Sequence, residues 1–174
     1  MPAASNIWKL FALKILRGNM LFMPTIVLFF QENGLSMFEV FLLQTFFGIA
    51  IFTLEIPSGY FADKFGRRNA ILIGAIATFI SFVIYSFASD FWTMLVAEML
   101  LGLGFAFTSG ADSALLFDSL RARGDDGSYR RVEGKLQGMY TISEAVGSVL
   151  GGYLALVSLR APLVAQAIID IFPI

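Results

Sequence analysis

Several carboxylic acids lie inside long apolar runs of this sequence, where an ionised side chain is costly. The candidates among them are Glu55, Glu98, Glu144 and Asp170. An ionised carboxylate at the centre of a bilayer costs about 2.5 to 3.5 kcal/mol on insertion scales, so such a residue needs a partner, a watery cavity or a proton. Each acid could therefore exchange a proton with a cavity. Alternatively, each stays neutral or hydrogen-bonded and only holds helices together.

Glu98, Glu144 and Glu55 are the candidates for proton exchange, in that order, and all three could line one cavity at mid-membrane depth. Polar side chains avoid lipid, which favours a cavity-facing position for Gln44. Arg17 could pair with one of the acids or bind an anionic substrate. Its long side chain could instead extend to the nearby membrane surface.

The composition excludes several other kinds of chemistry. The 174 residues contain no His and no Cys, so the chain has no imidazole base, thiol nucleophile, disulfide or usual zinc or iron–sulfur site. We therefore expect no catalytic residue, no metal, no bound cofactor and no enzymatic activity. The basic turns also contain Asp118, Asp125 and Asp126, which argues against binding of nucleic acid.

Membrane-spanning helices must position these side chains. The chain is 57% hydrophobic and only 14% charged, and its mean hydropathy of +0.77 excludes a soluble globular fold. A bilayer core about 30 Å thick requires about 20 apolar residues in a helix. The sequence predicts one transmembrane domain over residues 1–174, with spans at about 10–30, 37–62, 69–88, 91–117, 132–159 and 162–174, the last incomplete.

The positions of the cations predict how these spans are oriented. Alternate turns place eleven of the 12 Lys and Arg residues on the side of the N-terminus, and Arg160 alone lies on the other side. Cytoplasmic loops carry an excess of Lys and Arg. We therefore expect a cytoplasmic N-terminus in an integral protein of the cell (inner) membrane.

The turn between the second and third spans reads GYFADKFGRR. A glycine at position 66 permits a sharp backbone reversal, and one at position 59 lets another helix approach closely. The carboxylate between them can accept hydrogen bonds from an arginine or from a helix N-terminus. The turn resembles the signature of the major facilitator superfamily in its cytoplasmic loop between the second and third helices, matched by Gly59, Asp63, Lys64, Gly66, Arg67 and Arg68. A plain turn with anchoring charges is the alternative interpretation.

The resemblance implies an all-α, polytopic transmembrane helix bundle. Members of the superfamily usually have twelve helices in two six-helix bundles, which rock against each other in alternating access. We expect this chain to be the N-terminal six-helix half, truncated in helix 6. The signature turn would close the cytoplasmic side by contact with the second half. A half-size transporter that dimerises is the alternative.

Two more patterns bear on the resemblance. Gly138, Gly147 and Gly151 are separated by eight and then three residues, which is similar to the start of a glycine motif in exporting, proton-coupled members. Gly152 stands where that motif has proline, so plain helix packing is the alternative. Many members carry an arginine in the fourth span at the position of Glu98.

The sequence and the resemblance together predict a secondary active transporter. It would move a small organic solute or drug by alternating access, as an exporter coupled to a proton gradient rather than to a cofactor. The expected partners are the lipid bilayer, the small-molecule substrate, and the missing C-terminal bundle or a second copy of the chain, with no nucleic acid. The alternative is a non-transporting helix-bundle protein of the membrane that binds or regulates a partner.

Overall fold

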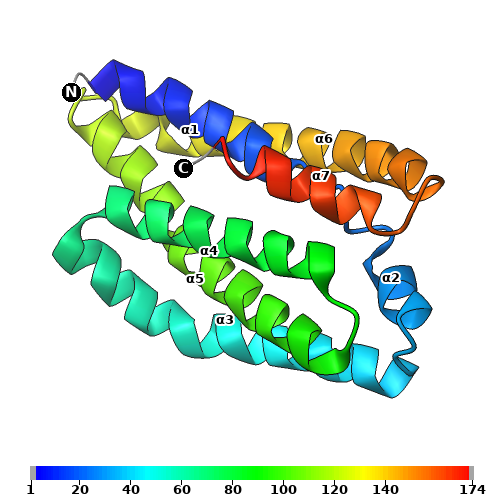
Figure 1. Cartoon of the computed structure of the whole chain (residues 1–174). Helices are drawn as coiled ribbons and strands as arrows, with labels where there is room; N and C mark the ends of the chain where they lie inside the picture. The colour runs from blue at the N-terminus through cyan, green and yellow to red at the C-terminus, as the bar shows by residue number, and fades with distance from the viewer. Residues whose placement is uncertain (1–2, 173–174) are drawn as a thin grey trace.

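The computed structural model describes residues 3–172, which form a bundle of helices (Figure 1). The all-α class predicted from the sequence is confirmed. The long helices run side by side, and most of their connections gather at the two ends of the bundle. The elements are α1 (Ala3–Gly18), α2 (Ile26–Glu32), α3 (Met37–Phe65), α4 (Arg67–Phe87), α5 (Phe91–Arg121), the short 3₁₀ helix η1 (Asp126–Ser128), α6 (Tyr129–Ala155) and α7 (Ala161–Ile169).

The helices α3, α4 and α5 are long and apolar enough to cross a membrane. They occupy the positions expected for the second, third and fourth spans, although α5 continues to Arg121. Ser36 caps the start of α3 through a reciprocal pair of hydrogen bonds with Glu39, and Asp90 caps the start of α5. Because α5 packs against both α3 and α4, it is the centre of this half of the bundle.

The expected first span, residues 10–30, is wrong as a continuous helix. The first helix ends at Gly18 and α2 begins at Ile26, with short turns between them. Pro24 has no backbone N–H and restricts the residue before it, so an α-helix cannot run through this segment undisturbed. We call residues 19–25 the break. It leaves α2 with seven residues, too few to cross a bilayer alone.

The last two helices pack beside the first. The 27-residue α6 lies along α1, and its apolar character is interrupted by charged residues in its first two turns and by Glu144. The nine-residue α7 begins with Pro162 in its first turn, where the missing N–H costs nothing, and packs on α4 and α6. The break between α1 and α2 lies against α6 and α7.

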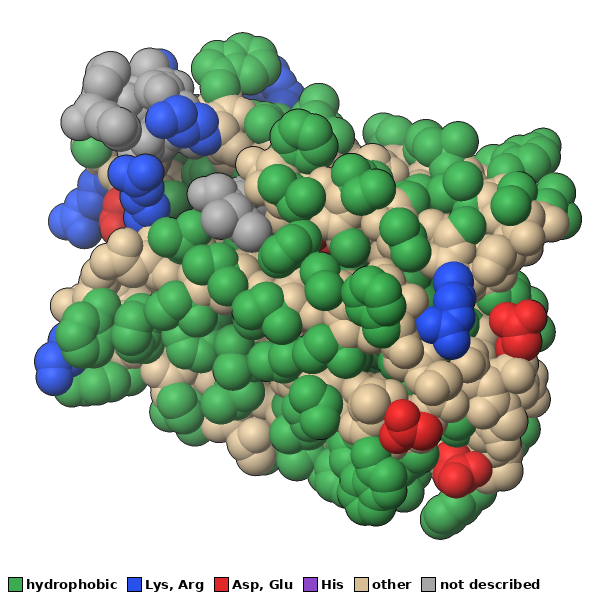
Figure 2. All heavy atoms as spheres, in the orientation of Figure 1, with side chains coloured by type: hydrophobic (Ala, Val, Ile, Leu, Met, Phe, Trp, Pro, Cys, Tyr) green, Lys and Arg blue, Asp and Glu red, His purple; other side chains and the backbone are tan. Residues whose placement is uncertain are grey.

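The cations gather at one end of the bundle. The start of α1, the α3–α4 turn and the α5–α6 connection lie together at the left of Figure 1, and Figure 2 shows most of the visible Lys and Arg side chains at that end. Arg160 lies at the opposite end, at the start of α7. The folded chain therefore has the charge asymmetry that the sequence indicates.

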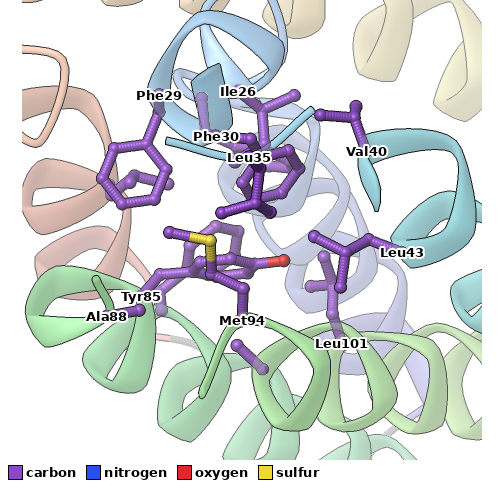
Figure 3. Packing of buried hydrophobic residues seen from close by; sticks show 14 of the residues in the cluster. Ile26, Phe29, Phe30, Leu35, Val40, Leu43, Tyr85, Ala88, Met94 and Leu101 are labelled. Atoms are coloured by element: carbon purple, nitrogen blue, oxygen red, sulfur yellow. The ribbon is translucent and has the colours of Figure 1, made fainter. Parts of the chain in front are cut away.

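The largest hydrophobic core lies between α2, α3, α4 and α5, towards the end opposite the cations (Figure 3). Phe29, Phe30 and Tyr85 are buried completely there, and the rings of Phe22 and Phe82 lie 4.7 Å apart between centroids. Large apolar side chains remain exposed on α3 and α6, as on a surface that faces lipid or another helix bundle.

Candidate functional site

A cavity of about 270 Å³ lies between α1, α4, α5, α6 and α7, and we call it the central cavity. Its walls combine ionic, hydrogen-bonding and aromatic side chains. The main ones are Lys14, Arg17, Phe22, Thr78, Phe82, Phe105, Thr108, Asp112, Gln137, Tyr140, Gln166 and Asp170. Such a mixture can hold a small solute by an apolar body and a polar group.

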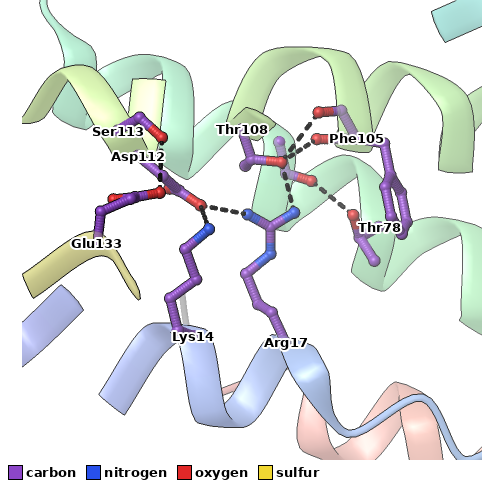
Figure 4. A network of polar contacts seen from close by, with 10 residues as sticks. Lys14, Arg17, Thr78, Phe105, Thr108, Asp112, Ser113 and Glu133 are labelled. Carbon is purple, nitrogen blue, oxygen red and sulfur yellow. Dashed lines mark hydrogen bonds and ion pairs between the residues drawn. The ribbon is translucent and has the colours of Figure 1, made fainter. Parts of the chain in front are cut away.

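Two cations of α1 share one carboxylate in this cavity (Figure 4). The Oδ2 atom of Asp112 lies 3.4 Å from Nζ of Lys14 and 3.7 Å from Nη1 of Arg17. The other terminal nitrogen of Arg17 donates a hydrogen bond to the hydroxyl of Thr108. Asp112 is 5% exposed, and its Oδ1 atom has no hydrogen-bond partner among the described residues. Arg17 thus points into the bundle instead of extending to the surface.

Sequence reasoning missed Asp112 as a functional candidate. The residue falls inside the expected fourth span, so the rule that singled out the other intramembrane acids applies to it equally. Its contacts with Lys14 and Arg17 join two segments that are about 95 residues apart in the chain, so only the folded structure shows them.

Asp170 lies in the same cavity and is connected to the break. The backbone N–H of Leu21 donates to Oε1 of Gln166 at 3.1 Å, and Nε2 of Gln166 donates to Oδ1 of Asp170 at 3.2 Å. Asp170 is 4% exposed, and its Oδ2 atom has no hydrogen-bond partner in the described part of the chain. An acid of the cavity is therefore linked through one amide to the backbone of the interrupted first span.

Glu98 occupies a second, smaller cavity of about 170 Å³ next to the hydrophobic core. The side chain is 2% exposed, and its Oε1 atom accepts a hydrogen bond from Nε2 of Gln44 at 3.1 Å. The other walls are mainly apolar and aromatic, and no Lys or Arg of the described residues lines this cavity. The structure thus brings Gln44 and Glu98 together, as the polar pattern of the second and fourth spans suggests.

The other two glutamates lie apart from Glu98, so the expectation of one cavity shared by all three is wrong. Glu55 is exposed and lines a third cavity beside the signature turn. Glu144 is half-buried on α6 and is not among the lining residues of these three cavities. The physical reason is helix packing, because α3 packs on α4 and α5 whereas α6 packs chiefly on α1.

The signature turn is fixed to α5 by Arg67. Its Nη1 atom lies 2.7 Å from Oδ2 of Asp118 and also donates a hydrogen bond to the carbonyl oxygen of Ala114. Gly66 ends α3 with a φ of +97°, in the left-handed region that favours glycine. These contacts hold the turn between α3 and α4 against α5.

The remaining signature residues lie at the surface of the described structure. Asp63, Lys64 and Arg68 are exposed, and Gly59 and Asp63 line the third cavity, of about 250 Å³, between α3 and α5. A Cβ atom at Gly59 would meet nothing within 4 Å among the described residues, so no helix of this part of the chain approaches it closely. The partner predicted for Asp63 lies outside the described contacts and stays a prediction.

The three glycines predicted to pack helices differ from one another. A Cβ atom at Gly147 would lie 2.8 Å from Oδ1 of Asn19, and one at Gly151 would lie 1.8 Å from the carbonyl oxygen of Leu21. The absence of a side chain at both glycines therefore allows the break to pack closely against α6. Gly138 faces open space in the described structure, so a packing role for it within this bundle is wrong.

The profile of the Major Facilitator Superfamily matches residues 16–172, which include nearly all of the bundle. This chain belongs to the major facilitator superfamily. It is 25% identical over 114 residues to the tetracycline resistance protein, class G, of Vibrio anguillarum, and these residues cover 66% of this chain and 28% of that protein. It is 23% identical over 140 residues to the class H protein of Pasteurella multocida, with 80% and 34% covered.

A third relative is the probable vesicular acetylcholine transporter-B of Danio rerio, which is 38% identical over 61 residues, or 35% of this chain and 12% of that protein. The chain spans about a third of the length of the tetracycline resistance proteins that it matches. As a major facilitator protein it is an integral membrane protein. The match contains the signature turn, the Glu98 cavity and the lining residues of the central cavity except Lys14.

Proposed function

We propose that this chain is part of a secondary active transporter that exports a small organic solute or drug by alternating access, driven by a proton gradient. Membership of the major facilitator superfamily supports transport, and the tetracycline resistance proteins among the relatives support drug export. The observation that carries the proton-coupled part is the burial of Glu98 with an amide as its hydrogen-bond donor and no Lys or Arg of the described residues in the lining of its cavity.

The environment of Glu98 supplies the physical reason for proton coupling. Removing an ionised carboxylate from water costs several kcal/mol unless a cation compensates it. Gln44 provides a neutral donor, and no Lys or Arg of the described residues lines the cavity, so we expect the buried Glu98 to carry a proton. A rearrangement that opens this cavity to water would favour proton release. Alternating access thereby couples proton movement to the conformational cycle.

The signature turn is proposed to act as the cytoplasmic gate. The salt bridge from Arg67 to Asp118 holds the turn in place, while the exposed Asp63 carboxylate remains available to a facing helix bundle. The excess of Lys and Arg at this end supports, by the positive-inside rule, a cytoplasmic position of the turn in a protein of the inner membrane. Asp63→Asn should slow transport while the protein still inserts normally.

Transport by the intact protein in liposomes tests the proposal. Tetracycline is the first probe of a panel of small drugs, and an imposed pH gradient should drive its movement, which a proton uncoupler abolishes. Absence of flux for the whole panel would contradict transport of this class of solute and favour the non-transporting alternative.

Glu98→Gln tests the proton site. This variant should lose pH-driven accumulation but retain exchange of labelled for unlabelled solute, because exchange needs the conformational change without net proton movement. Glu32→Gln, an exposed glutamate at the end of α2, is the matched control and should behave like the parent protein. Full pH-driven accumulation by Glu98→Gln would refute Glu98 as the proton site.

A further inference from the structure

We propose that the central cavity binds an amphipathic organic anion, with its carboxylate or similar group between Lys14 and Arg17 and its apolar body against the aromatic wall. This inference rests on the proposed transport function and names the class of substrate. It uses the central cavity and is independent of the acid in the Glu98 cavity.

The first argument is the ratio of cations to available carboxylate oxygens. Lys14 and Arg17 lie one turn apart on α1 and both approach the same oxygen of Asp112. Their distances of 3.4 and 3.7 Å exceed the roughly 2.7–2.9 Å of a charge-assisted hydrogen bond. An ammonium group has three donors and a guanidinium five, so both cations retain donors for a further anion.

The second argument concerns the acids of the cavity. Asp112 already faces two cations, and its free Oδ1 atom is enclosed by protein. Asp170 accepts from Gln166 through Oδ1, and its Oδ2 atom is enclosed as well. Neither acid therefore presents an open oxygen to a cationic ligand. Asp112 serves instead as a loosely held counter-ion whose place beside Arg17 a ligand anion can take.

The third argument is the shape and lining of the cavity. Phe22, Phe82 and Phe105 form an aromatic wall, and the volume of about 270 Å³ is near the lower limit of the roughly 300–1,000 Å³ of ligand pockets. Gln137 and Tyr140 add hydrogen-bonding groups from α6. An acid with one or two rings fits these properties. Charges inside such a partly enclosed cavity also interact more strongly than in water.

The test is equilibrium binding of tritiated 1-naphthoate to the intact protein in lipid nanodiscs, without any gradient. Unlabelled 1-naphthoate and benzoate should compete, whereas neutral 1-naphthamide and cationic 1-naphthylmethylamine should compete at least tenfold more weakly. Arg17→Gln should weaken binding about tenfold or more, the order expected for removing one charge several ångströms from the ligand. Lys9→Gln, an exposed cation on the same helix, is the matched control and should bind like the parent.

Asp112→Asn decides the sign of the ligand charge. Removing this negative charge frees both cations, so binding of 1-naphthoate should tighten about tenfold or more, a gain that misfolding cannot produce. If Asp112→Asn alone does not fold, the double variant Lys14→Gln with Asp112→Asn takes its place in the test. The double variant has the net charge of the parent protein, so it should fold, and it should bind 1-naphthoate within about threefold of the parent.

The anion site would be overturned by the absence of saturable 1-naphthoate binding or by unchanged binding in Arg17→Gln. It would also be overturned if the naphthylmethylammonium ion bound more tightly than 1-naphthoate and Asp112→Asn weakened its binding. Because binding is measured without a gradient, its failure is separable from a failure of transport. A protein that binds 1-naphthoate but moves no solute would contradict the transport proposal and leave the anion site standing.

Discussion

Replacing Gly151 with alanine should disturb the contact between α6 and the break that separates α1 from α2. A Cβ atom on Gly151 would lie 1.8 Å from the carbonyl oxygen of Leu21 and 2.7 Å from its carbonyl carbon. These are backbone atoms in a turn, so they cannot swing aside as the end of a flexible side chain could. The substitution must move α6 away from the break or change the backbone of the break itself.

The expected magnitude follows from two opposing effects. Overpacking costs about 1–3 kcal/mol, and a deep overlap with backbone belongs at the upper end of that range. Alanine in place of glycine inside a helix returns about 0.5–1 kcal/mol. We therefore expect Gly151→Ala to lower the free energy of unfolding by about 2 kcal/mol.

The neighbouring glycine provides the matched control. A Cβ atom at Gly152 would meet nothing within 4 Å among the described residues, so Gly152→Ala should show only the gain of about 0.5–1 kcal/mol from helix propensity. The assay is reversible unfolding of the intact protein in mixed micelles, followed by helical circular dichroism. Equal stability of the Gly151 and Gly152 variants would refute the close packing of the break on α6.

Three further predictions concern the ends of the bundle. Gly66→Ala should destabilise the protein by about 1–3 kcal/mol in the same unfolding assay, because alanine rarely adopts a φ of +97°, and an unchanged midpoint would contradict this conformation. Arg160→Gln should lower the free energy of unfolding by about 1–3 kcal/mol, because Arg160 donates hydrogen bonds to Asn33 at 3.1 Å and to a carbonyl oxygen of α4. Lysine cannot make both hydrogen bonds, so full stability of Arg160→Lys would argue against them. The Thr93 side chain, together with backbone N–H groups, holds the pKa of Asp90 below its ordinary value of 3.8. The contribution of this cap to the stability of the fold is therefore complete above pH 3.8, and it is lost as the pH falls through the lower pKa that Asp90 has in the folded protein. Asp90→Asn should remove that acid-dependent loss of thermal stability, and an identical acid profile in the variant would count against the cap.

Much of the architecture could be predicted from local properties of the sequence. The apolar runs of α3, α4 and α5 are long enough to identify a span without knowledge of its neighbours. The positive end of the bundle follows from counting cations in alternate turns, and the spacing of the signature turn resembles that of the family to which the chain belongs. These features are local because each depends on a run of adjacent residues or on one short turn.

The first span shows where such reasoning stops. Its hydropathy predicts one continuous helix over residues 10–30, whereas the chain breaks at residues 19–25. Pro24 is a visible signal of that break, but the extent of the break depends on α6, where Gly147 and Gly151 provide room for it. Hydropathy has no information about a neighbouring helix that is more than 120 residues away in the chain.

The sequence by itself determined the membrane class, the resemblance to the family, the charged end and four candidate acids of the membrane interior, among which Asp112 was missing. The tertiary structure decided which acids meet cations: Asp112 lies beside Lys14 and Arg17, Glu98 lies beside Gln44, and Glu144 lies apart from both. Hydropathy fixes the depth of a residue in the bilayer but leaves the rotation of each helix about its axis open. That rotation is set by side-chain packing between helices, and it determines which polar groups share a cavity.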